Sequence, residues 1–280
     1  MGVPELPEVE TIRRQLAAVS IGHTISRLRI LDPLLVAPNS PNRVRRLVEG
    51  RRIERARRRG KYLLLDLDSG DTLAMHLRMT GRLHHSLDGT APADRHRRAR
   101  FTFDDGATLD FSDTRRFGRL WIVSADHPDP EGYWNARLGV EPLERQFTAA
   151  RLGALLEGRT APIKASILDQ RLVAGVGNIY ADEALFQAGV HPTRPAGSLH
   201  ANEVAALRDA IRDRLRVGIR SGGASIDRYR DTIGNAGAMQ DMLRVHLHEG
   251  DPCPQCGTTV VKTRVAQRGT YFCPTCQPVD

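Results

Sequence analysis

The sequence predicts an α+β protein with an N-terminal β-sandwich that carries a leading helix, a helical middle domain and a C-terminal ribbon module. Three observations support this fold class. Short apolar runs separated by turn residues fill the first half, apolar residues at helical spacing follow from about residue 148, and all four cysteines lie in the last forty residues. We therefore predict three domains, at residues 1–134, 135–240 and 241–280.

The first part begins with a short helix and continues in strands. Val9, Ile12 and Leu16 form one apolar stripe at helical spacing, and Pro7 suits the first turn of that helix. Five apolar runs then predict strands at residues 62–67, 72–77, 100–103, 108–111 and 120–123. Turn residues join the first four of these runs as two hairpins. Short strands punctuated by turns are typical of a β-sandwich.

The second half changes to helical spacing. Helices are predicted at residues 152–156, 163–170, 179–188 and 199–221, and a glycine pair at 222–223 ends the last of them. Residues 126–132 are predicted to form a loop, and residues 139–145 a linker between the two halves. Polar residues with two glycines at 225–242 predict a mobile loop.

The cysteine spacing predicts a metal site. Cys253 and Cys256 form one Cys-x-x-Cys pair, Cys273 and Cys276 form another, and sixteen residues separate the two pairs. This spacing is typical of a zinc ribbon, in which two tight turns supply four thiolates to one tetrahedral ion. Four thiolates leave no open coordination position, so we predict one structural Zn2+ rather than a catalytic metal.

Composition narrows the class of protein. The net charge of +8 at pH 7 favours a polyanionic partner. Because there is no long apolar run and no charged-then-apolar leader, we expect a cytoplasmic protein without a membrane span. The basic residues comprise 38 arginines and three lysines, Lys61, Lys164 and Lys262. Lysine can lose its proton where arginine cannot, which makes the lysines candidates for chemistry.

Residues 4–10, with the sequence PELPEVE, are the most informative stretch of the chain. A proline at a free N-terminus carries a secondary amine that can attack a sugar aldehyde carbon and form an iminium ion, which makes Pro4 a candidate nucleophile. Glu5 lies beside it and could move protons during such chemistry. A helix start explains Pro7 and the later glutamates, but not the earlier proline–glutamate pair.

Three parts of the chain carry a resemblance to a known family: residues 4–10, the segment GVGNIYADE at 175–183 and the four cysteines. The chain resembles bacterial formamidopyrimidine-DNA glycosylases over a span from Pro4 to Gln277. The resemblance implies a bifunctional DNA glycosylase and abasic-site lyase of base excision repair. Such an enzyme removes oxidised purines (8-oxoguanine and formamidopyrimidines) from duplex DNA through a Schiff base and β,δ-elimination. It also implies a helix–two-turn–helix element in the middle domain, no redox or nucleotide cofactor, and a monomer that binds double-stranded DNA containing oxidised bases or abasic sites.

The resemblance also implies roles for single residues. Pro4 would attack the sugar C1′, while Glu5, helped by Glu8, would handle proton transfers. Lys61 and Arg268 would act near the scissile phosphate and in the elimination steps. The implied DNA-binding residues are Met79, His96, Arg115, Phe117, Arg159, Lys164 and Asn178.

Three of these residues would fill the gap that a flipped nucleotide leaves in the base stack: Met79, Arg115 and Phe117. Arg115 would take the orphaned cytosine, and Phe117 would wedge beside it. Thr114 stands where the family has a proline, which should loosen this turn a little. Residues 225–241 would form the loop that covers the lesion.

One feature conflicts with a nucleophilic Pro4. The chain as written carries Met1, Gly2 and Val3 before Pro4, so the proline nitrogen would be an amide without a usable lone pair. The arginine bias indicates a GC-rich gene, in which GTG encodes valine and also serves as a start codon. We therefore predict that Val3 is a misread start and that the native chain begins at Pro4.

Two alternatives stay open. The chain could be an endonuclease VIII-like enzyme acting on oxidised pyrimidines, or a DNA-binding protein without catalysis. Leu6 and the complete set of inserting side chains favour the purine enzyme over the first alternative. The second depends on whether Pro4 is N-terminal.

Overall fold

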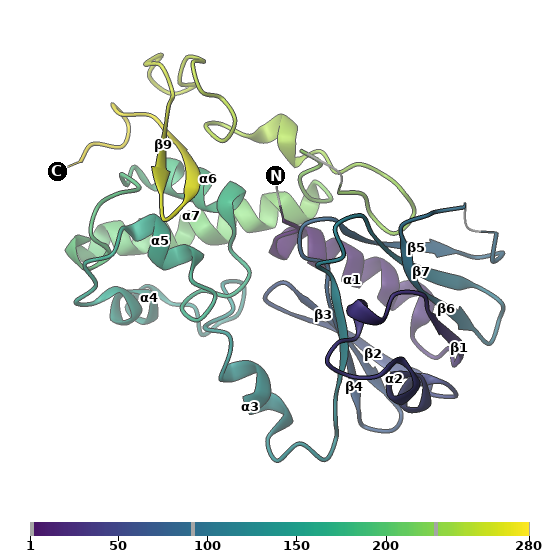
Figure 1. Ribbon diagram of the computed structural model, residues 1–280. Helices are drawn as coiled ribbons and strands as arrows, with labels where there is room; N and C mark the ends of the chain where they lie inside the picture. The colour runs from purple at the N-terminus through teal and green to yellow at the C-terminus, as the bar shows by residue number, and fades with distance from the viewer. Residues whose placement is uncertain (1–2, 91–92, 227–228, 280) are drawn as a thin grey trace. The chain divides into compact units, whose positions relative to one another are not determined.

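The computed structural model describes residues 3–90, 93–226 and 229–279, with the backbone alone at Pro130 and Glu131 (Figure 1). The chain forms two compact units. The first comprises residues up to 134 together with 221–238, and the second comprises residues 135–220 together with those from 239 onward.

Helix α1 (Leu6–Ser20) opens the first unit. One carboxylate oxygen of Glu8 accepts the backbone N–H of Glu5 at 2.8 Å, which satisfies a donor that the first helical turn leaves unpaired. Val9, Ile12 and Leu16 are buried, so the predicted apolar stripe faces the core.

Two four-stranded antiparallel sheets confirm the predicted β-sandwich. The first sheet has the order β1-β6-β7-β5, and the second has the order β2-β3-β4-β8. The strands are β1 (Ile25–Ile30), β6 (Arg97–Phe103), β7 (Thr108–Asp113), β5 (Gly81–Ser86), β2 (Ile53–Arg59), β3 (Tyr62–Leu67), β4 (Thr72–His76) and β8 (Arg119–Val123). Buried side chains from both sheets and from α1 share one apolar core.

Some elements of this unit were not predicted from the sequence. They are β1, β2, β5, helix α2 (Pro41–Val48) and helix α3 (Pro130–Asn135). Helix α3 starts inside the stretch predicted as a loop at residues 126–132, so that prediction was wrong at its end. Strand β2 buries only Ile53 and Ala56, while Arg57 makes two hydrogen bonds of 2.6 and 2.8 Å to Asp66 on β3.

The second unit contains the predicted helices: α4 (Ala149–Leu156), α5 (Ile163–Leu168), α6 (Asn178–Ala188) and α7 (Ala201–Arg220). Helices α6 and α7 pack closely, because a Cβ at Gly218 of α7 would lie only 2.3 Å from the Tyr180 hydroxyl of α6. Gly189 ends α6 in the left-handed conformation, with φ of 69°. Within the described residues, no helix has the length and apolar character needed to cross a membrane.

The C-terminal ribbon shares this second unit. Strands β9 (Val261–Val265) and β10 (Arg268–Phe272) form an antiparallel hairpin. Tyr271 and the buried cysteines pack against Phe186 of α6 and against Val245. The ribbon therefore rests on the helices rather than standing apart from them.

Residues 221–238 belong with the sandwich, whereas the sequence placed them in a middle domain at 135–240; the boundary after residue 134 coincides with the predicted one. Glu8 accepts the backbone N–H of Ala224 at 2.7 Å. Gln15 of α1 accepts both the backbone N–H and the hydroxyl of Thr232, at 3.0 and 2.9 Å. Thr232 is buried, and its carbonyl accepts the backbone N–H of His85 at 2.7 Å. The predicted lesion loop is thus fastened at both α1 and β5.

Candidate functional site

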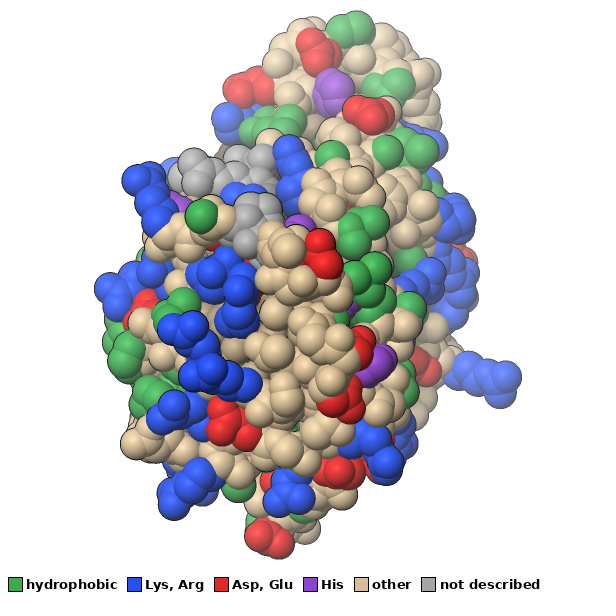
Figure 2. All heavy atoms as spheres, turned by 90° about the vertical axis from the view of Figure 1, so that its right-hand side faces the viewer, with side chains coloured by type: hydrophobic (Ala, Val, Ile, Leu, Met, Phe, Trp, Pro, Cys, Tyr) green, Lys and Arg blue, Asp and Glu red, His purple; other side chains and the backbone are tan. Residues whose placement is uncertain are grey.

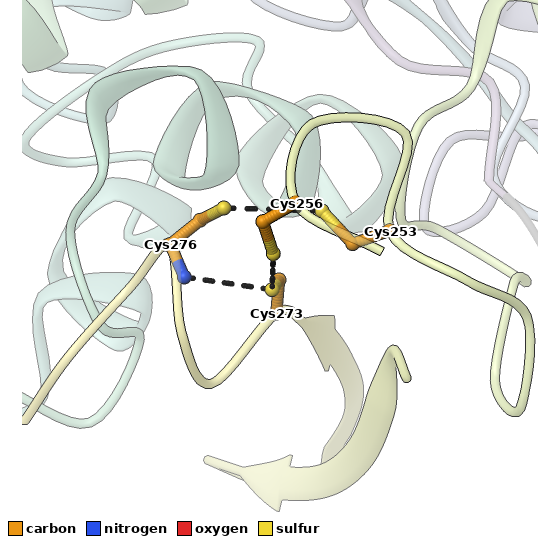
Figure 3. A group of neighbouring side chains, drawn as sticks. All are labelled: Cys253, Cys256, Cys273 and Cys276. Atoms are coloured by element: carbon orange, nitrogen blue, oxygen red, sulfur yellow. Dashed lines mark hydrogen bonds between the residues drawn. The ribbon is translucent and has the colours of Figure 1, made fainter. Parts of the chain in front are cut away.

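The four predicted metal ligands meet in the ribbon (Figure 3). The sulfurs of Cys253 and Cys276 lie 3.8 Å apart, and those of Cys256 and Cys273 lie 3.5 Å apart. Sulfurs bound at about 2.3 Å to one tetrahedral ion are separated by about 3.8 Å, and a disulfide would need about 2 Å. The four side chains therefore fit one structural zinc ion.

The thiols differ in how readily they lose their protons. Hydrogen bonds from Thr258 lower the pKa of Cys256 to about 6. Burial raises the pKa values of Cys273 and Cys276. Zinc binds thiolates, so loading this site must release protons, and the ion compensates for the burial of charge.

Below the ribbon, two side chains converge on one carbonyl. Lys164 of α5 and Asn178 of α6 each donate a hydrogen bond of 2.9 Å to the carbonyl oxygen of Gly269. Arg268 precedes that carbonyl and is exposed at the start of β10. The turn before it places Ala266 and Gln267 at φ of 46° and 61°, which non-glycine residues adopt at a cost. The hairpin is therefore held in a defined position next to Arg268.

Lys164 does not lie where the resemblance implied. Its side chain is fully buried and forms an ion pair of 2.6 Å with Asp182 of α6. Its ammonium group also donates to Thr270 at 2.8 Å. A buried ammonium with these partners supports the hairpin and does not present itself to DNA, so the expectation of a direct DNA contact is corrected.

Two carboxylates of α6 anchor the segment before the ribbon. Asp182 also contacts the ring Nδ1 of His246 at 2.8 Å. Glu183 accepts the backbone N–H groups of Arg244, Val245 and His246, each at 3.0 Å. These contacts join the segment before the ribbon to α6 through buried carboxylates.

The glycine-containing turn before α6 is also held by a side chain. Gln170 accepts the backbone N–H of Gly175 and donates to the carbonyl of Val176, each at 2.8 Å. Asn178 is the first residue of α6, at the positive end of the helix dipole. Arg159 is exposed, and its Nε donates to the carbonyl of Leu155 at 2.7 Å.

In the first unit, Pro4 and Glu5 are buried directly before α1. Both carboxylate oxygens of Glu8 accept backbone N–H groups, from Glu5 and from Ala224, so Glu8 fixes the start of the helix to residues 221–238. Lys61 is half-buried in the turn before β3. Burial lowers the pKa of His76 on β4, and the charges of Arg78 and Lys61 lower it further.

The three predicted inserting residues are in contact. The guanidinium of Arg115 lies 4.7 Å from the ring centre of Phe117 and 3.3 Å from the sulfur of Met79. Phe117 is 45% exposed, which is high for a large aromatic side chain in a structured turn. Met79 precedes β5, whereas Arg115 and Phe117 lie between β7 and β8. Two loops therefore present one cluster, here called the insertion cluster (Met79, Arg115 and Phe117).

A left-handed residue stands beside each part of the insertion cluster. Arg78 has φ of 54° and Arg116 has φ of 60°. The backbone N–H of Arg78 is accepted by Nδ1 of His76 at 2.9 Å. Arg116 makes two hydrogen bonds to Asp32, of 2.6 and 2.8 Å, and these bonds hold the pKa of Asp32 below its usual range.

A pocket of about 420 Å³ lies beside this cluster in the first unit. His96, which is half-buried, lines it together with Thr80, Asp113 and Arg230. Its walls carry both carboxylates and cations, so neither sign of charge dominates the lining.

Models of three protein families match the chain in order. The formamidopyrimidine-DNA glycosylase N-terminal domain matches residues 3–120, the H2TH domain of the same enzymes matches 138–230, and the zinc finger found in FPG and IleRS matches 250–279. The formamidopyrimidine-DNA glycosylase of Roseiflexus sp. (strain RS-1) is 45% identical over 276 residues, covering 98% of this chain and all 100% of the relative. That of Pelotomaculum thermopropionicum is 45% identical over 278 residues, covering 99% and 100%.

The chain belongs to the formamidopyrimidine-DNA glycosylase family. Solved members are similar in fold. The MutM (FPG) protein of Thermus thermophilus has a TM-score of 0.87 and 43% identity, covering 99% of this chain and 100% of that one. Lactococcus lactis FPG in complex with Fapy-dG-containing DNA has a TM-score of 0.89 and 35% identity, covering 98% and 100%. The same protein has also been solved with DNA containing an oxidised pyrimidine, at a TM-score of 0.89, 34% identity and coverage of 98% and 100%.

Sequence analysis did not single out several residues that hold the loops of the candidate site and the ribbon in place. They are Asp32, His76, Thr80, Asp113 and Asp182. Each is a common polar residue whose partner is distant in sequence or lies across a turn, so no local pattern singles it out. Asp182 stands within the segment 175–183 that carries the resemblance, and Asp113 stands at a strand end two residues before the arginine pair, so the sequence offered a signal for these two alone.

Proposed function

We propose that this chain is a bifunctional DNA glycosylase and abasic-site lyase that acts as a monomer in the cytoplasm. It removes oxidised purines from duplex DNA in base excision repair. The observation that carries the proposal is the insertion cluster: an exposed phenylalanine, an arginine stacked on it and a methionine meet on two loops. Such a group fills the space that a flipped nucleotide leaves, and a protein that only coated DNA would not need it.

The chemistry is assigned to the start of the chain. The amine lone pair of Pro4 forms a bond to the sugar C1′, the bond from C1′ to the base breaks, and the amine proton leaves with the base. The nitrogen lone pair then expels the ring oxygen O4′, which takes up a proton, so the sugar ring opens and an iminium ion forms at C1′. The resulting iminium ion acidifies the C2′ proton, so the bond to the 3′ phosphate oxygen breaks, followed by the bond to the 5′ phosphate oxygen. Glu5 moves protons at the opened sugar, and Lys61 and Arg268 stabilise the phosphates that leave.

DNA binding is assigned to residues from both units. His96, Arg159 and Asn178 contact phosphates, and the insertion cluster enters the stack. Residues 225–241 cover the extruded base. Asn178 already donates to Gly269, so a contact with phosphate requires a change of partner or a role through the hairpin.

A trapping experiment tests the nucleophile. A chain that begins at Pro4 is incubated with an abasic duplex and borohydride, which reduces the iminium ion to a stable covalent link. We expect a covalent complex from this chain, weaker trapping from Pro4→Gly, which retains a primary amine, and none after acetylation of the N-terminus. A chain that keeps residues 2 and 3 and still traps DNA would move the nucleophile to a lysine, with Lys61 the first to test.

A panel of duplexes distinguishes the proposed enzyme from the two alternative functions. 8-Oxoguanine, a formamidopyrimidine and an oxidised pyrimidine are each placed opposite cytosine or their usual partner. Faster release of the two purine lesions supports the proposal, and faster release of the pyrimidine supports an endonuclease VIII-like enzyme. Binding to all duplexes without release of a base or trapping on an abasic site indicates a DNA-binding protein without catalysis.

A further inference from the structure

Two loops supply the insertion cluster, and the sheet brings their ends together. Strands β5 and β7 are antiparallel neighbours, and Gly81 at the start of β5 pairs with Asp113 at the end of β7. The loop that carries Met79 therefore enters the sheet where the loop that carries Arg115 and Phe117 leaves it. Side-chain contacts at this end of β5 and β7 can therefore set the distance between the two loops.

Thr80 and Asp113 form the direct link between them. The hydroxyl of Thr80 donates a hydrogen bond to Oδ1 of Asp113. The same hydroxyl accepts the backbone N–H of Arg115 at 3.1 Å, and Oδ1 of Asp113 accepts that N–H at 3.1 Å as well. One hydroxyl thus joins the Met79 loop to both the carboxylate and the backbone of the other loop.

Asp113 also fixes the far end of its own loop. Its Oδ2 accepts the backbone N–H of Gly118 at 2.7 Å, and the side chain is only 1% exposed. A Cβ at Gly118 would lie 2.7 Å from the ring of Phe111, so the chain passes close to the core at this point. The loop between is therefore tied at Arg115 and Gly118 to one buried carboxylate.

The link between the loops matters because each loop contains one residue in an unfavourable backbone conformation. Arg78 and Arg116 hold left-handed conformations, which are unfavourable for a residue with a Cβ. Without the cross-link, His76 and Asp32 would still support each loop separately, but only the sheet pairing of Gly81 with Asp113 would relate one loop to the other.

We propose that Thr80 is a positioning residue whose hydroxyl holds the two loops of the insertion cluster at the spacing required to fill a flipped-out nucleotide's place. The proposal rests on the proposed function, because it assigns the cluster that role. Thr80 itself does not touch the reacting atoms. Its hydroxyl keeps Met79, Arg115 and Phe117 in their bound arrangement before DNA binds, so these side chains lose less conformational entropy on binding.

Matched variants at one position test this. Thr80→Val keeps the shape of the side chain and removes the hydroxyl, whereas Thr80→Ser keeps the hydroxyl and removes a methyl group. Each variant is compared with the wild-type protein in single-turnover release of 8-oxoguanine opposite cytosine and in nicking of a preformed abasic duplex. Thr80→Val should slow base release about tenfold and nicking by about twofold or less, and Thr80→Ser should restore most of the base release.

A second variant removes the risk that Thr80→Val simply unfolds the edge of the sheet. Asp113→Asn keeps the shape but replaces one acceptor, and it should also slow base release more than nicking. Thermal unfolding of each variant gives its folded fraction. Equal losses on both substrates, or full base release by Thr80→Val, would overturn the positioning role. A wild-type protein that releases no base would instead overturn the proposed function, so the two failures are distinguishable.

Discussion

His76 shows how a single buried side chain supports a surface loop. Its Nδ1 accepts the backbone N–H of Arg78, the left-handed residue next to Met79, so this nitrogen carries no proton. Burial, reinforced by the charges of Arg78 and Lys61, lowers the pKa of His76 to about 3. The neutral ring is therefore part of the folded structure, and its protonation opposes folding.

The sign of this effect predicts a dependence of stability on pH. The unfolded chain takes up a proton at His76 near pH 6.5 but the folded chain only near pH 3, so folding loses stability as the pH falls through this window. The loss reaches about 1.4 kcal/mol per pH unit from this group. His76→Asn keeps an acceptor near Nδ1 and cannot titrate. Urea unfolding at several pH values should show a shallower acid loss for the variant, and identical slopes would contradict the assignment.

The exposed side chains of the insertion cluster give the next test. Phe117→Ala or Arg115→Ala should slow release of 8-oxoguanine from a duplex by about tenfold or more, because the vacated stack is no longer filled. Nicking at a preformed abasic site should fall much less, since a missing base has less stacking to overcome. Leu87→Ala is the control, because Leu87 is 76% exposed beside β5 and outside the cluster. Equal losses on both substrates would mean that these residues only support the fold.

At the scale of the element, the ribbon hairpin depends on the helices beneath it. Lys164 and Asn178 share the carbonyl of Gly269, and Asp182 balances the charge of Lys164. Removing one partner of a buried ion pair costs about 3–5 kcal/mol, because the other charge is left uncompensated. The hairpin that carries Arg268 should loosen when this support is lost.

Three variants around the lysines test that dependence. Lys164→Met keeps the stem and removes the charge, so it should lower the unfolding temperature and weaken DNA binding. Adding Asp182→Asn removes the stranded carboxylate and should recover part of the stability. Lys262→Met is the control, since Lys262 is 42% exposed on the same hairpin and pairs with Glu249 at the surface. Similar losses for Lys164→Met and Lys262→Met would contradict the structural role.

The zinc site predicts a second effect at this scale. Cys273→Ser should release the metal and weaken DNA binding, while the β-sandwich stays folded, because the ribbon packs on the helices of its own unit. Metal analysis of the wild-type protein should give about one zinc per chain. Circular dichroism in the near ultraviolet follows the aromatic cluster of Tyr62, Trp121 and Trp134 in the sandwich, which should not change. Loss of that signal would show that the two units unfold together.

Some strands and the ribbon could be predicted from the sequence, and other features could not. Strand β3 buries a run of leucines and could be predicted, whereas β2 is rich in arginine, and its Arg57 pairs across the sheet with Asp66 of β3. The cysteine spacing identified the ribbon because ligand geometry is local. The burial of Lys164 could not be predicted, since its partners lie far along the chain. The sequence shows that lysine is rare in this chain, but only the packing shows whether a given lysine faces solvent.

At the scale of the whole molecule, the charge of +8 is carried almost entirely by arginine. Figure 2 shows basic side chains spread over one face, with acidic ones between them. Many of the arginines are paired in the structure, for example Arg97 and Arg100 with Asp110 and Arg116 with Asp32. Net charge therefore overstates the number of arginines that can bind phosphate, and the effective number must be measured.

The salt dependence of DNA binding measures the number of phosphate contacts. Each phosphate contact releases condensed counterions, so the logarithm of affinity falls linearly with the logarithm of salt concentration, with a slope of about 0.9 per contact. Arg268 is exposed at the start of β10, where a phosphate can reach its guanidinium, so Arg268→Ala should lower this slope by about one unit. Arg14→Ala is the control, because Arg14 is paired with Glu10 on α1 and should leave the slope nearly unchanged. An unchanged slope for Arg268→Ala would remove Arg268 from the phosphate contacts, and a lower slope for Arg14→Ala would mean that the charge acts as a diffuse field rather than through defined contacts.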